Sequence, residues 1–411
     1  MALSGVTPEL SARDRAGLAA MRLVNGASRR SGRGLGTVAG GRVAMRVAPR
    51  LLERLARGLE LALVSGTNGK TTTTACLTAA LSTKCAVATN ASGSNMLPGH
   101  LAALGGTRAP CAVLECDEVW LPRAIPLEQP RAVVLLNLSR DQLDRTSEVR
   151  HVARGWQAAI ETYEGACVAN ADDPLVVSAA TGAPGVAWFA GGLEFAGDAS
   201  SCPRCMARLE FDEHGWRCTC GLARPDVDAS LGEGSALVDG TEVPFAMALP
   251  GRFNRGNGLA ALLAATRLGV DVEAAAAAIC SVTDVAGRFS TIDVDGTTAR
   301  LLLAKNPAGW SALLQLLDGD TAPVVVAVNA RVADGIDPSW LYDVDFEQLF
   351  GRRVVATGER WRDLSTRLFY AGVVHATEAD PRRAIAVAGS GQEAVDVVAN
   401  YTAFAGLHTG R

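Results

Sequence analysis

The sequence predicts an α/β fold in which a parallel-sheet domain with a phosphate-binding loop is followed by a second, C-terminal α/β domain. Three observations support this fold class. Short apolar runs alternate with helical patterns along most of the 411 residues, as in parallel sheets covered on both faces. A glycine-rich loop joins one such run to a helix at residues 65–74. Two closely spaced cysteine pairs within residues 202–220 predict a four-cysteine zinc ribbon inserted in the first domain.

The glycine-rich loop follows the apolar run Leu61–Val64, so the chain passes from a strand through glycines into a helix. This arrangement directs backbone N–H groups and a helix N-terminus at an anion. We therefore expect the loop to bind nucleotide phosphates, with Lys70 as a mobile positive charge and the Thr71 hydroxyl on Mg²⁺. The alternative is a Gly/Thr-rich turn that merely precedes a helix. The expected nucleotide-binding residues of the loop are Gly66, Thr67, Asn68, Gly69, Lys70, Thr71 and Thr72.

Lysine is rare in this chain, which makes each lysine informative. Of the 39 basic residues, only Lys70, Lys84 and Lys305 are lysines. A compact ammonium and a planar guanidinium bind phosphate differently. The lysine in the loop therefore strengthens the phosphate-binding interpretation.

Polar residues stand where the predicted strands after the loop end. The run 112–114 leads into carboxylates up to Glu118, and the run 132–136 leads into Asn137. A third strand, 166–169, leads into Asn170-Ala171-Asp172-Asp173-Pro174. Ligands bind outside the carboxyl ends of parallel strands, so we expect a site along that edge of the sheet.

The ten cysteines fall into two groups. Cys202, Cys205, Cys218 and Cys220 form CxxC and CxC knuckles that suit tetrahedral Zn²⁺. Four thiolates close the coordination sphere, so the zinc is expected to be structural. The others are expected to be small buried hydrophobes of a reducing compartment; they are Cys76, Cys85, Cys111, Cys116, Cys167 and Cys280.

Composition limits the partners and the compartment. A net charge of −4 argues against general nucleic-acid binding, and neither a membrane-spanning run nor a signal peptide is recognisable, so a cytoplasmic protein is expected. Residues 1–50 differ, with nine arginines against Glu9 and Asp14. They are expected to form a solvated helical or partly disordered arm, the alternative being an amphipathic segment that touches anionic lipid. The expected domains are 1–54, 55–295 with the insertion 191–228, and 296–411.

Several motifs resemble a known family. The loop 66–71 resembles that of Mur ligases and folylpolyglutamate synthetases, with Val64 where the general pattern has its first glycine. Residues 170–174 and 251–257 resemble two further blocks of the Mur ligase central domain, and the resemblance covers about residues 55–290. The cysteine insertion and the C-terminal half resemble the MurT-type subunit of lipid II isoglutaminyl synthase, at residues 303–309, 333–340, 343–347 and 367–372.

This resemblance implies an ATP-dependent ligase that works as a heterodimer. A partner glutaminase subunit would release ammonia from glutamine. The Mur-like subunit would activate the α-carboxylate of D-glutamate in the lipid II stem peptide as an acyl phosphate and form the amide. The implied cofactors are ATP, Mg²⁺ and structural Zn²⁺, and the implied location is the cytoplasm near the inner face of the membrane, with contact through the lipid-linked substrate.

The resemblance also implies roles for residues outside the loop. Glu115 would join Thr71 as a Mg²⁺ ligand, with Asp117 and Glu118 as alternatives. Nucleotide contacts are implied for Asn254, Asn257 and Arg288. Asparagine beside glycine is also common in turns, and Arg288 could be a surface charge at a domain hinge.

One carboxylate of the C-terminal domain is implied to serve the partner. Asp337 would orient the histidine of the glutaminase Cys-His pair, with Asp334 and Asp343 as alternatives. Asp337 could instead cap a helix that begins near Pro338. Lys305 could serve the acceptor or the acyl phosphate, or be an interface charge.

Two departures weaken an ordinary amino-acid ligase. No lysine lies between Lys84 and Lys305, where such enzymes carry a carbamylated lysine, and Gln142 stands where a metal-binding histidine is common. None of the cysteines and histidines forms a recognisable glutaminase motif, so ammonia is expected from a partner. The alternatives are a Mur or folylpolyglutamate-type amino-acid ligase and, from another class, a zinc-ribbon ATP-binding regulator of nucleic acid.

Overall fold

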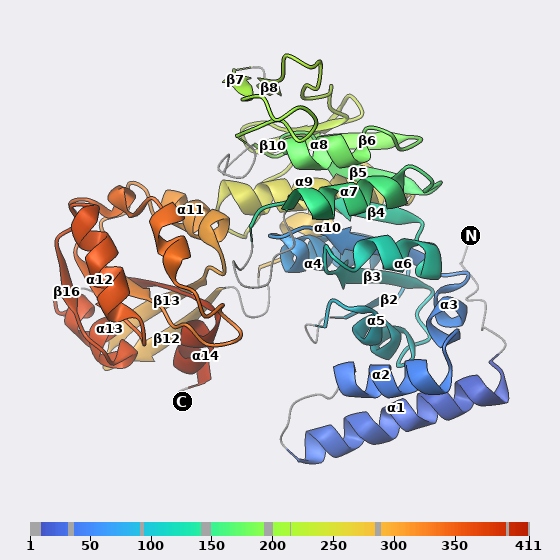
Figure 1. Cartoon of the computed structure of the whole chain (residues 1–411), viewed down its shortest axis with the longest axis horizontal. Helices are drawn as coiled ribbons and strands as arrows, with labels where there is room; N and C mark the ends of the chain where they lie inside the picture. The colour runs from blue at the N-terminus through green and yellow to red at the C-terminus, as the bar shows by residue number, and fades with distance from the viewer. Residues whose placement is uncertain are drawn as a thin grey trace. The chain divides into compact units, whose positions relative to one another are not determined.

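The computed structural model describes residues 10–31, 37–90, 94–140, 149–192, 200–213, 215–283, 289–391 and 394–409 (Figure 1). The chain forms two compact units. The first contains most of the chain up to Thr283, and the second consists mainly of the chain from Asp284 to the C-terminus. The boundary between the units falls at residues 283–284, about ten residues before the boundary at 295 expected from the sequence. Arg288 lies outside the described residues.

The first unit is built on a nine-stranded sheet with the order β11-β10-β9-β6-β5-β4-β1-β3-β2. The seven strands β9-β6-β5-β4-β1-β3-β2 pair in parallel, while β10 and β11 form an antiparallel edge. Their bounds are β1 Glu60–Ser65, β2 Val87–Thr89, β3 Cys111–Cys116, β4 Ala132–Leu135, β5 Ala166–Asn170, β6 Val186–Ala190, β9 Ala229–Leu231, β10 Ser235–Val238 and β11 Thr241–Pro244.

Helices cover both faces of this sheet. Successive strand residues point to opposite faces, so Ala62 and Val64 of β1 pack with α4, α9 and α10, while Leu61 and Leu63 pack with α5 to α8. The apolar character of β1 follows from burial on both sides and confirms the expected α/β fold. The helix bounds are α4 Lys70–Leu81, α5 Leu97–Leu104, α6 Leu121–Glu128, α7 Val149–Ile160, α8 Pro174–Ala180, α9 Arg252–Arg267 and α10 Val272–Cys280.

The N-terminal segment is folded onto the first unit. Helices α1 (Ala12–Arg30), α2 (Thr37–Val47) and α3 (Leu51–Ala56) contribute buried side chains to the same core as α5 to α8. At Gly41, a side chain would overlap the carbonyl of Pro98, so glycine lets α2 approach α5 closely. Among the described residues, no helix combines the length and the hydropathy needed to cross a membrane.

The cysteine-rich segment interrupts the strand order between β6 and β9. It contains the antiparallel pair β7 (Glu210–Asp212) and β8 (Gly215–Arg217). Its small core combines Leu209, Trp216 and Leu222 with Val177 of α8. The insertion is therefore a small module packed on the first unit.

The second unit has a six-stranded sheet with the order β12-β13-β17-β14-β15-β16. The β12–β13 pair is antiparallel and the other pairs are parallel. Its elements are β12 Phe289–Val294, β13 Thr297–Leu303, α11 Pro307–Leu316, β14 Val324–Ala327, η2 Ser339–Asp343, η3 Phe346–Leu349, β15 Val354–Thr357, α12 Trp361–Tyr370, β16 His375–Thr377, α13 Pro381–Gly389, β17 Ala394–Ala399 and α14 Tyr401–Thr409.

Strand β17 is a central strand that the sequence analysis did not identify. Its apolar run is interrupted by Asp396, which is fully buried and accepts a 2.7 Å bond from Arg300 of the neighbouring β13. Burial raises the pKa of Asp396, while the Arg300 guanidinium acts in the opposite direction. A buried carboxylate is tolerated here because it is paired.

The expectation that all six scattered cysteines are free is wrong for two of them. Cys85 and Cys111 form a disulfide, because the neighbouring parallel strands β2 and β3 bring the chain just before β2 next to the first residue of β3. The cysteines are 26 residues apart, and no local spacing pattern signals this pair. Cys76, Cys116 and Cys167 are free and buried, as expected, while Cys280 is free but only partly buried.

We predict that reduction of this disulfide lowers the free energy of unfolding by about 3 kcal/mol, from the loop-closure entropy of a crosslink of this length. The measurement is thermal unfolding with and without reductant. The control is the Cys85→Ala/Cys111→Ala double variant, whose melting temperature should not respond to reductant. Protein that is denatured in the presence of a metal chelator, without reductant, should show eight reactive thiols, since two of the ten cysteines are in the disulfide. Ten reactive thiols before reduction would contradict the pairing.

Candidate active site and metal centre

The loop after β1 is shaped by two glycines. Gly66 has φ +152°, and a Cβ there would lie 2.9 Å from Leu136 Cβ. Gly69 has φ +84°, and a Cβ there would overlap Oδ1 of Asn257. Both positions combine a positive φ with close neighbours, so they accept glycine alone. The loop can therefore lie directly against the end of β4 and against α9.

Asn137, which follows β4, holds the loop in place. The Asn68 N–H donates to Asn137 Oδ1 at 2.8 Å, and Asn137 Nδ2 donates back to the Asn68 carbonyl at 3.1 Å. The Thr67 N–H donates to the Asn137 carbonyl at 2.9 Å. Sequence reasoning placed Asn137 at a strand end without giving it a role. The available signal was its place as the first polar residue after a strand that lies beside β1.

Lys70 begins α4 and folds back over its own loop. Its Nζ donates to the carbonyls of Thr67, at 3.1 Å, and Gly66, and lies 3.2 Å from Oε2 of Glu118. The Lys70 and Glu118 side chains are 12% and 15% exposed. N-cap Gly69 supplies no side chain to the first turn of α4, so no cap competes for its N–H groups. The loop can therefore accept an anion through N–H groups and an ammonium.

Three carboxylates lie on β3 or just beyond it. Glu115 pairs in register with Val64 of β1, which places it at the edge where the loop begins. Glu118 is the carboxylate that contacts Lys70. Asp117 accepts from the N–H of Val119 at 3.1 Å. Glu115 lies at the edge where the loop begins and Glu118 contacts Lys70, so either carboxylate can serve a cation there.

A buried ion pair beneath β3 positions Glu115. His100 Nε2 donates to the Glu115 carbonyl, and His100 Nδ1 lies 2.8 Å from Oε1 of Glu128. Both side chains are fully buried. Burial lowers the pKa of His100, but the Glu128 carboxylate and the bond to the Glu115 carbonyl act together in the opposite direction, and the pKa is raised. Asn90 also bonds both backbone groups of Glu115. The sequence analysis assigned none of these supports.

Two asparagines of α9 differ in their surroundings. Asn257 lies against Gly69 and hence against the loop. Asn254 is almost completely buried and donates from Nδ2 to the Pro250 carbonyl at 2.6 Å, which fixes the entry of the chain into α9. Asn257 therefore lies beside the phosphate-binding loop, whereas the Asn254 amide is bonded to the turn that precedes α9. Thr71 lies in the first turn of α4, and Thr72 is buried beneath it.

The block 170–174 connects the sheet edge to the inserted module. Asp173 caps α8 by accepting from the N–H of Leu175, and its second oxygen accepts from the N–H of Leu138 at 2.8 Å. Asp172 forms a 2.7 Å ion pair with Arg224 of the module. Trp216 of the module donates to the Ala171 carbonyl at 3.1 Å. The module is thereby joined to the turn that follows β5.

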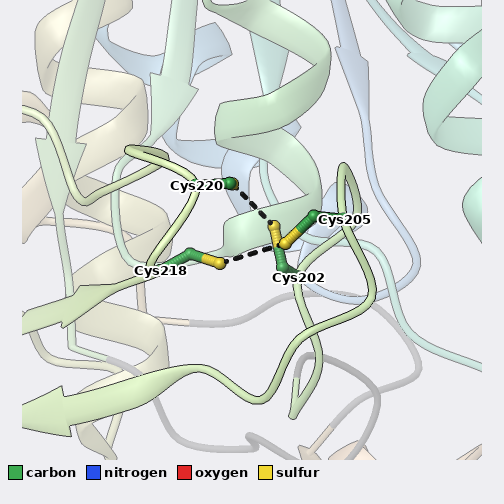
Figure 2. A group of neighbouring side chains, drawn as sticks. All are labelled: Cys202, Cys205, Cys218 and Cys220. Carbon is green, nitrogen blue, oxygen red and sulfur yellow. Dashed lines mark hydrogen bonds between the residues drawn. The ribbon is translucent and has the colours of Figure 1, made fainter.

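The four predicted zinc ligands converge (Figure 2). Their sulfurs all lie within 4.8 Å of one another, with Cys202 and Cys220 at 3.6 Å and Cys205 and Cys218 at 3.4 Å. Four sulfurs bound at about 2.3 Å to one tetrahedral zinc stand about 3.8 Å apart, so the arrangement fits this ion. The Cys220 N–H lowers the pKa of the Cys218 thiol, whereas the neighbouring thiols raise the pKa of Cys205, so the four thiols would not all ionise together without a bound cation.

The aspartates of the second unit have different environments. Asp337 is exposed and accepts from the Ser339 N–H at 2.9 Å, and this bond lowers its pKa. Asp334 is buried and accepts from the Thr402 N–H at 2.8 Å. Asp343 is about one-third exposed at the end of η2. The exposed carboxylate of Asp337 is available to a partner, whereas Asp334 is used inside the unit.

Known proteins match both units. Residues 64–265 match the Mur ligase middle domain, and residues 303–404 match the family described as MurT ligase C-terminal. The subunit MurT of lipid II isoglutaminyl synthase (glutamine-hydrolyzing) from Streptococcus pneumoniae is 31% identical over 374 residues, covering 82% of this chain and 83% of that protein. The chain belongs to the MurT family. The MurT subunit of Staphylococcus aureus is 30% identical, covering 86% of each chain.

Solved structures share the fold. A pseudomurein peptide ligase type C from Methanothermus fervidus superposes with a TM-score of 0.66 at 21% identity, covering 86% of this chain and 78% of that one. The resemblance to MurT-type Mur ligases drawn from the sequence motifs is thus confirmed, and with it the Mur ligase fold. The match to the middle domain includes both the loop and the four ribbon cysteines.

We predict that the purified chain carries about one zinc ion, and that Cys205→Ser abolishes tight zinc binding, because three thiolates leave the coordination sphere open. Metal analysis measures the content. Hydrogen exchange should show loss of protection within residues 200–224 and no change in the second unit. Cys280→Ser, which alters a cysteine outside the cluster, is the control. Equal zinc content in Cys205→Ser and wild-type protein would contradict the site.

Proposed function

We propose that this chain is the ATP-dependent amidating subunit of a lipid II isoglutaminyl synthase. It converts the α-carboxylate of D-glutamate in the stem peptide of lipid II to the amide through an acyl phosphate, with ammonia from a glutaminase subunit. The observation that carries the proposal is the similarity to MurT subunits, which extends over both units of the chain. We place the reaction in the cytoplasm, at the inner face of the membrane that carries lipid II.

The residues present fit Mg-ATP. The loop offers the uncapped N–H groups of the first turn of α4, the Lys70 ammonium and the Thr71 hydroxyl, and β3 offers the Glu115 carboxylate. ATP supplies the phosphoryl group that makes the carboxylate electrophilic. On binding ATP, the Lys70 ammonium would exchange the Glu118 carboxylate for phosphate oxygens. Because Lys70 is already largely buried, this exchange adds little desolvation of its charge. Asn257, beside Gly69, would contact the nucleotide from α9, and Asn254 and Arg288 remain predicted contacts.

The thiols of this chain are unsuited to glutamine hydrolysis. Outside the ribbon and the disulfide, the free cysteines are Cys76, Cys116, Cys167 and Cys280. Burial raises the pKa of the Cys76 and Cys167 thiols to about 12, and it raises those of Cys116 and Cys280 as well. The thiolate is the nucleophilic form, so these cysteines are inert at neutral pH. This supports a separate subunit as the source of ammonia.

The second unit offers a surface suited to such a partner. Helix α12 contacts η2 and η3. Exposed aromatic residues lie on these elements or at their ends: Tyr342, Phe350, Phe369 and Tyr370, each more than 60% exposed. Exposed aromatic side chains are enriched at protein interfaces. Asp337 lies just before η2, which supports its role in completing the active site of the glutaminase.

We predict that amidation of lipid II requires ATP, the glutaminase subunit and Lys70. Lys70→Ala should lower the rate roughly 100-fold or more, because the site loses its positive charge on the transferring phosphoryl group. Lys84→Ala is the matched control, since Lys84 bonds the Leu268 carbonyl beyond the other end of α4. Mass spectrometry of the muropeptide measures the product. Undiminished activity of Lys70→Ala would refute the proposal, and amino-acid-dependent ATP turnover without glutaminase would favour an amino-acid ligase.

We predict that Asp337→Asn in the complex lowers glutamine-dependent amidation roughly 100-fold, because a histidine without its carboxylate is wrongly oriented. Amidation supported by ammonium chloride should stay unchanged, since it bypasses the glutaminase. Asp343→Asn serves as the comparison. If Asp343→Asn, and not Asp337→Asn, lowers glutamine-dependent amidation while amidation with ammonium chloride is unchanged, the assignment to Asp337 is wrong.

A further inference from the structure

Helices α1 and α2, here called the N-terminal hairpin, and the residues after it expose charge of one sign. Besides Arg13, seven exposed arginines lie there: Arg15, Arg22, Arg29, Arg30, Arg42, Arg46 and Arg50. Within the described part of residues 10–50, Asp14 is the one carboxylate, and it is buried and ion-paired with Arg54. This surface is strongly positive although the chain has a net charge of −4.

Several arginines elsewhere in the chain are paired with carboxylates. Arg267 pairs with Asp239, Arg300 with Asp396 and Arg367 with Glu347. None of the seven hairpin arginines forms an ion pair with a residue that the structure describes. Unpaired like charges repel one another, and an anionic surface relieves that repulsion.

The arginines share a solvent-facing surface of α1. Arg15, Arg22 and Arg29 recur every seven residues, so they lie along one face. The buried residues of α1 form another face, with Leu18 and Met21 in the core. Leu23 is 75% exposed among the arginines, and the other exposed positions include Ala12, Ala16, Ala19 and Ala27. The solvent face thus combines arginines with small or apolar side chains.

The hairpin is a folded surface. A Cβ at Gly17 would lie 3.1 Å from Ala48 Cβ, and a Cβ at Gly40 would overlap the Asn25 amide, so α1 and α2 pack closely. Arg13 donates to the Val47 carbonyl at the end of α2. Within the first unit, α2 lies between α1 and α5, and α1 is the outermost layer (Figure 1). Because the helices are already folded, binding through these arginines requires no loss of backbone conformational entropy.

We infer that the N-terminal hairpin docks the chain on an anionic lipid surface. Arginines on an alanine-rich helix with an exposed leucine suit the headgroup boundary, where charge and apolar contact both contribute. The exposed side chains between the arginines of α1 lack the aromatic rings that stack nucleic-acid bases. Each arginine near such a surface contributes about a fivefold increase in partitioning. Docking through these arginines does not depend on the proposed reaction, though a lipid-linked substrate would lie on the same surface.

The test is partitioning of the full chain onto vesicles that contain no lipid II. Phosphatidylglycerol vesicles should bind it at about 0.1 M salt, and phosphatidylcholine vesicles or about 0.5 M salt should abolish binding. The Arg15→Gln/Arg22→Gln/Arg29→Gln variant should lose binding about 100-fold, and the Arg→Lys variant at the same positions should retain it. The matched control replaces three exposed arginines elsewhere on the unit, Arg108, Arg131 and Arg154, by Gln.

Three results would overturn the inference. Equal binding to both kinds of vesicle would show that charge does not drive it. Equal loss in the hairpin variant and in the control variant would show that the hairpin is not the site. Tighter binding to duplex DNA than to anionic vesicles, abolished by the same three substitutions, would assign the surface to nucleic acid. Unchanged thermal unfolding of the variants excludes misfolding as the cause, and an unchanged rate on a soluble muropeptide separates docking from the proposed reaction.

Discussion

The candidate active site depends on the hydrogen bonds by which the end of β4 holds the loop after β1. Asn137 closes a reciprocal pair with Asn68, and its carbonyl takes a third bond from Thr67. These bonds form because β4 is the direct neighbour of β1 and because Gly66 lets the backbones meet. Lys70 and Thr71 take their places from a loop fixed in this way, and Lys70 meets Glu118, which follows β3. Side-chain and backbone bonds within the protein thus fix the shape of the loop, and a loop held in this way loses less entropy on binding.

Local patterns in the sequence were sufficient for features that depend on neighbours in the chain. The strand–glycine–helix order at residues 61–74 identified β1, the loop and α4. The spacing of the four cysteines located a cluster whose sulfurs indeed converge. The alternation of apolar runs and helices gave two α/β units, because a strand buried on both faces is apolar throughout.

Features that depend on strand order could not be predicted in the same way. The contact between Lys70 and Glu118, the brace at Asn137 and the Cys85–Cys111 disulfide all join residues on or beside adjacent strands, and adjacency is set by topology. Strand β17 was missed because Asp396 breaks its apolar pattern, and the partner that makes this charge tolerable, Arg300, lies 96 residues earlier. The ion pair of His100 and Glu128 was missed for the same reason, since its members are buried only in the folded chain.

The contacts of the zinc module extend further than its own core. Trp216 and Arg224 hold Ala171 and Asp172, the next residue Asp173 holds Leu138, and Leu138 follows Asn137. A continuous series of hydrogen bonds and chain neighbours therefore runs from the metal centre to the loop after β1. Zinc that orders the module would also favour the arrangement of the turn after β5, because Trp216 and Arg224 bond that turn. We therefore expect the module to support, through Asp173 and Leu138, the end of β4 against which the loop packs, so that loss of zinc would be felt beyond the module itself.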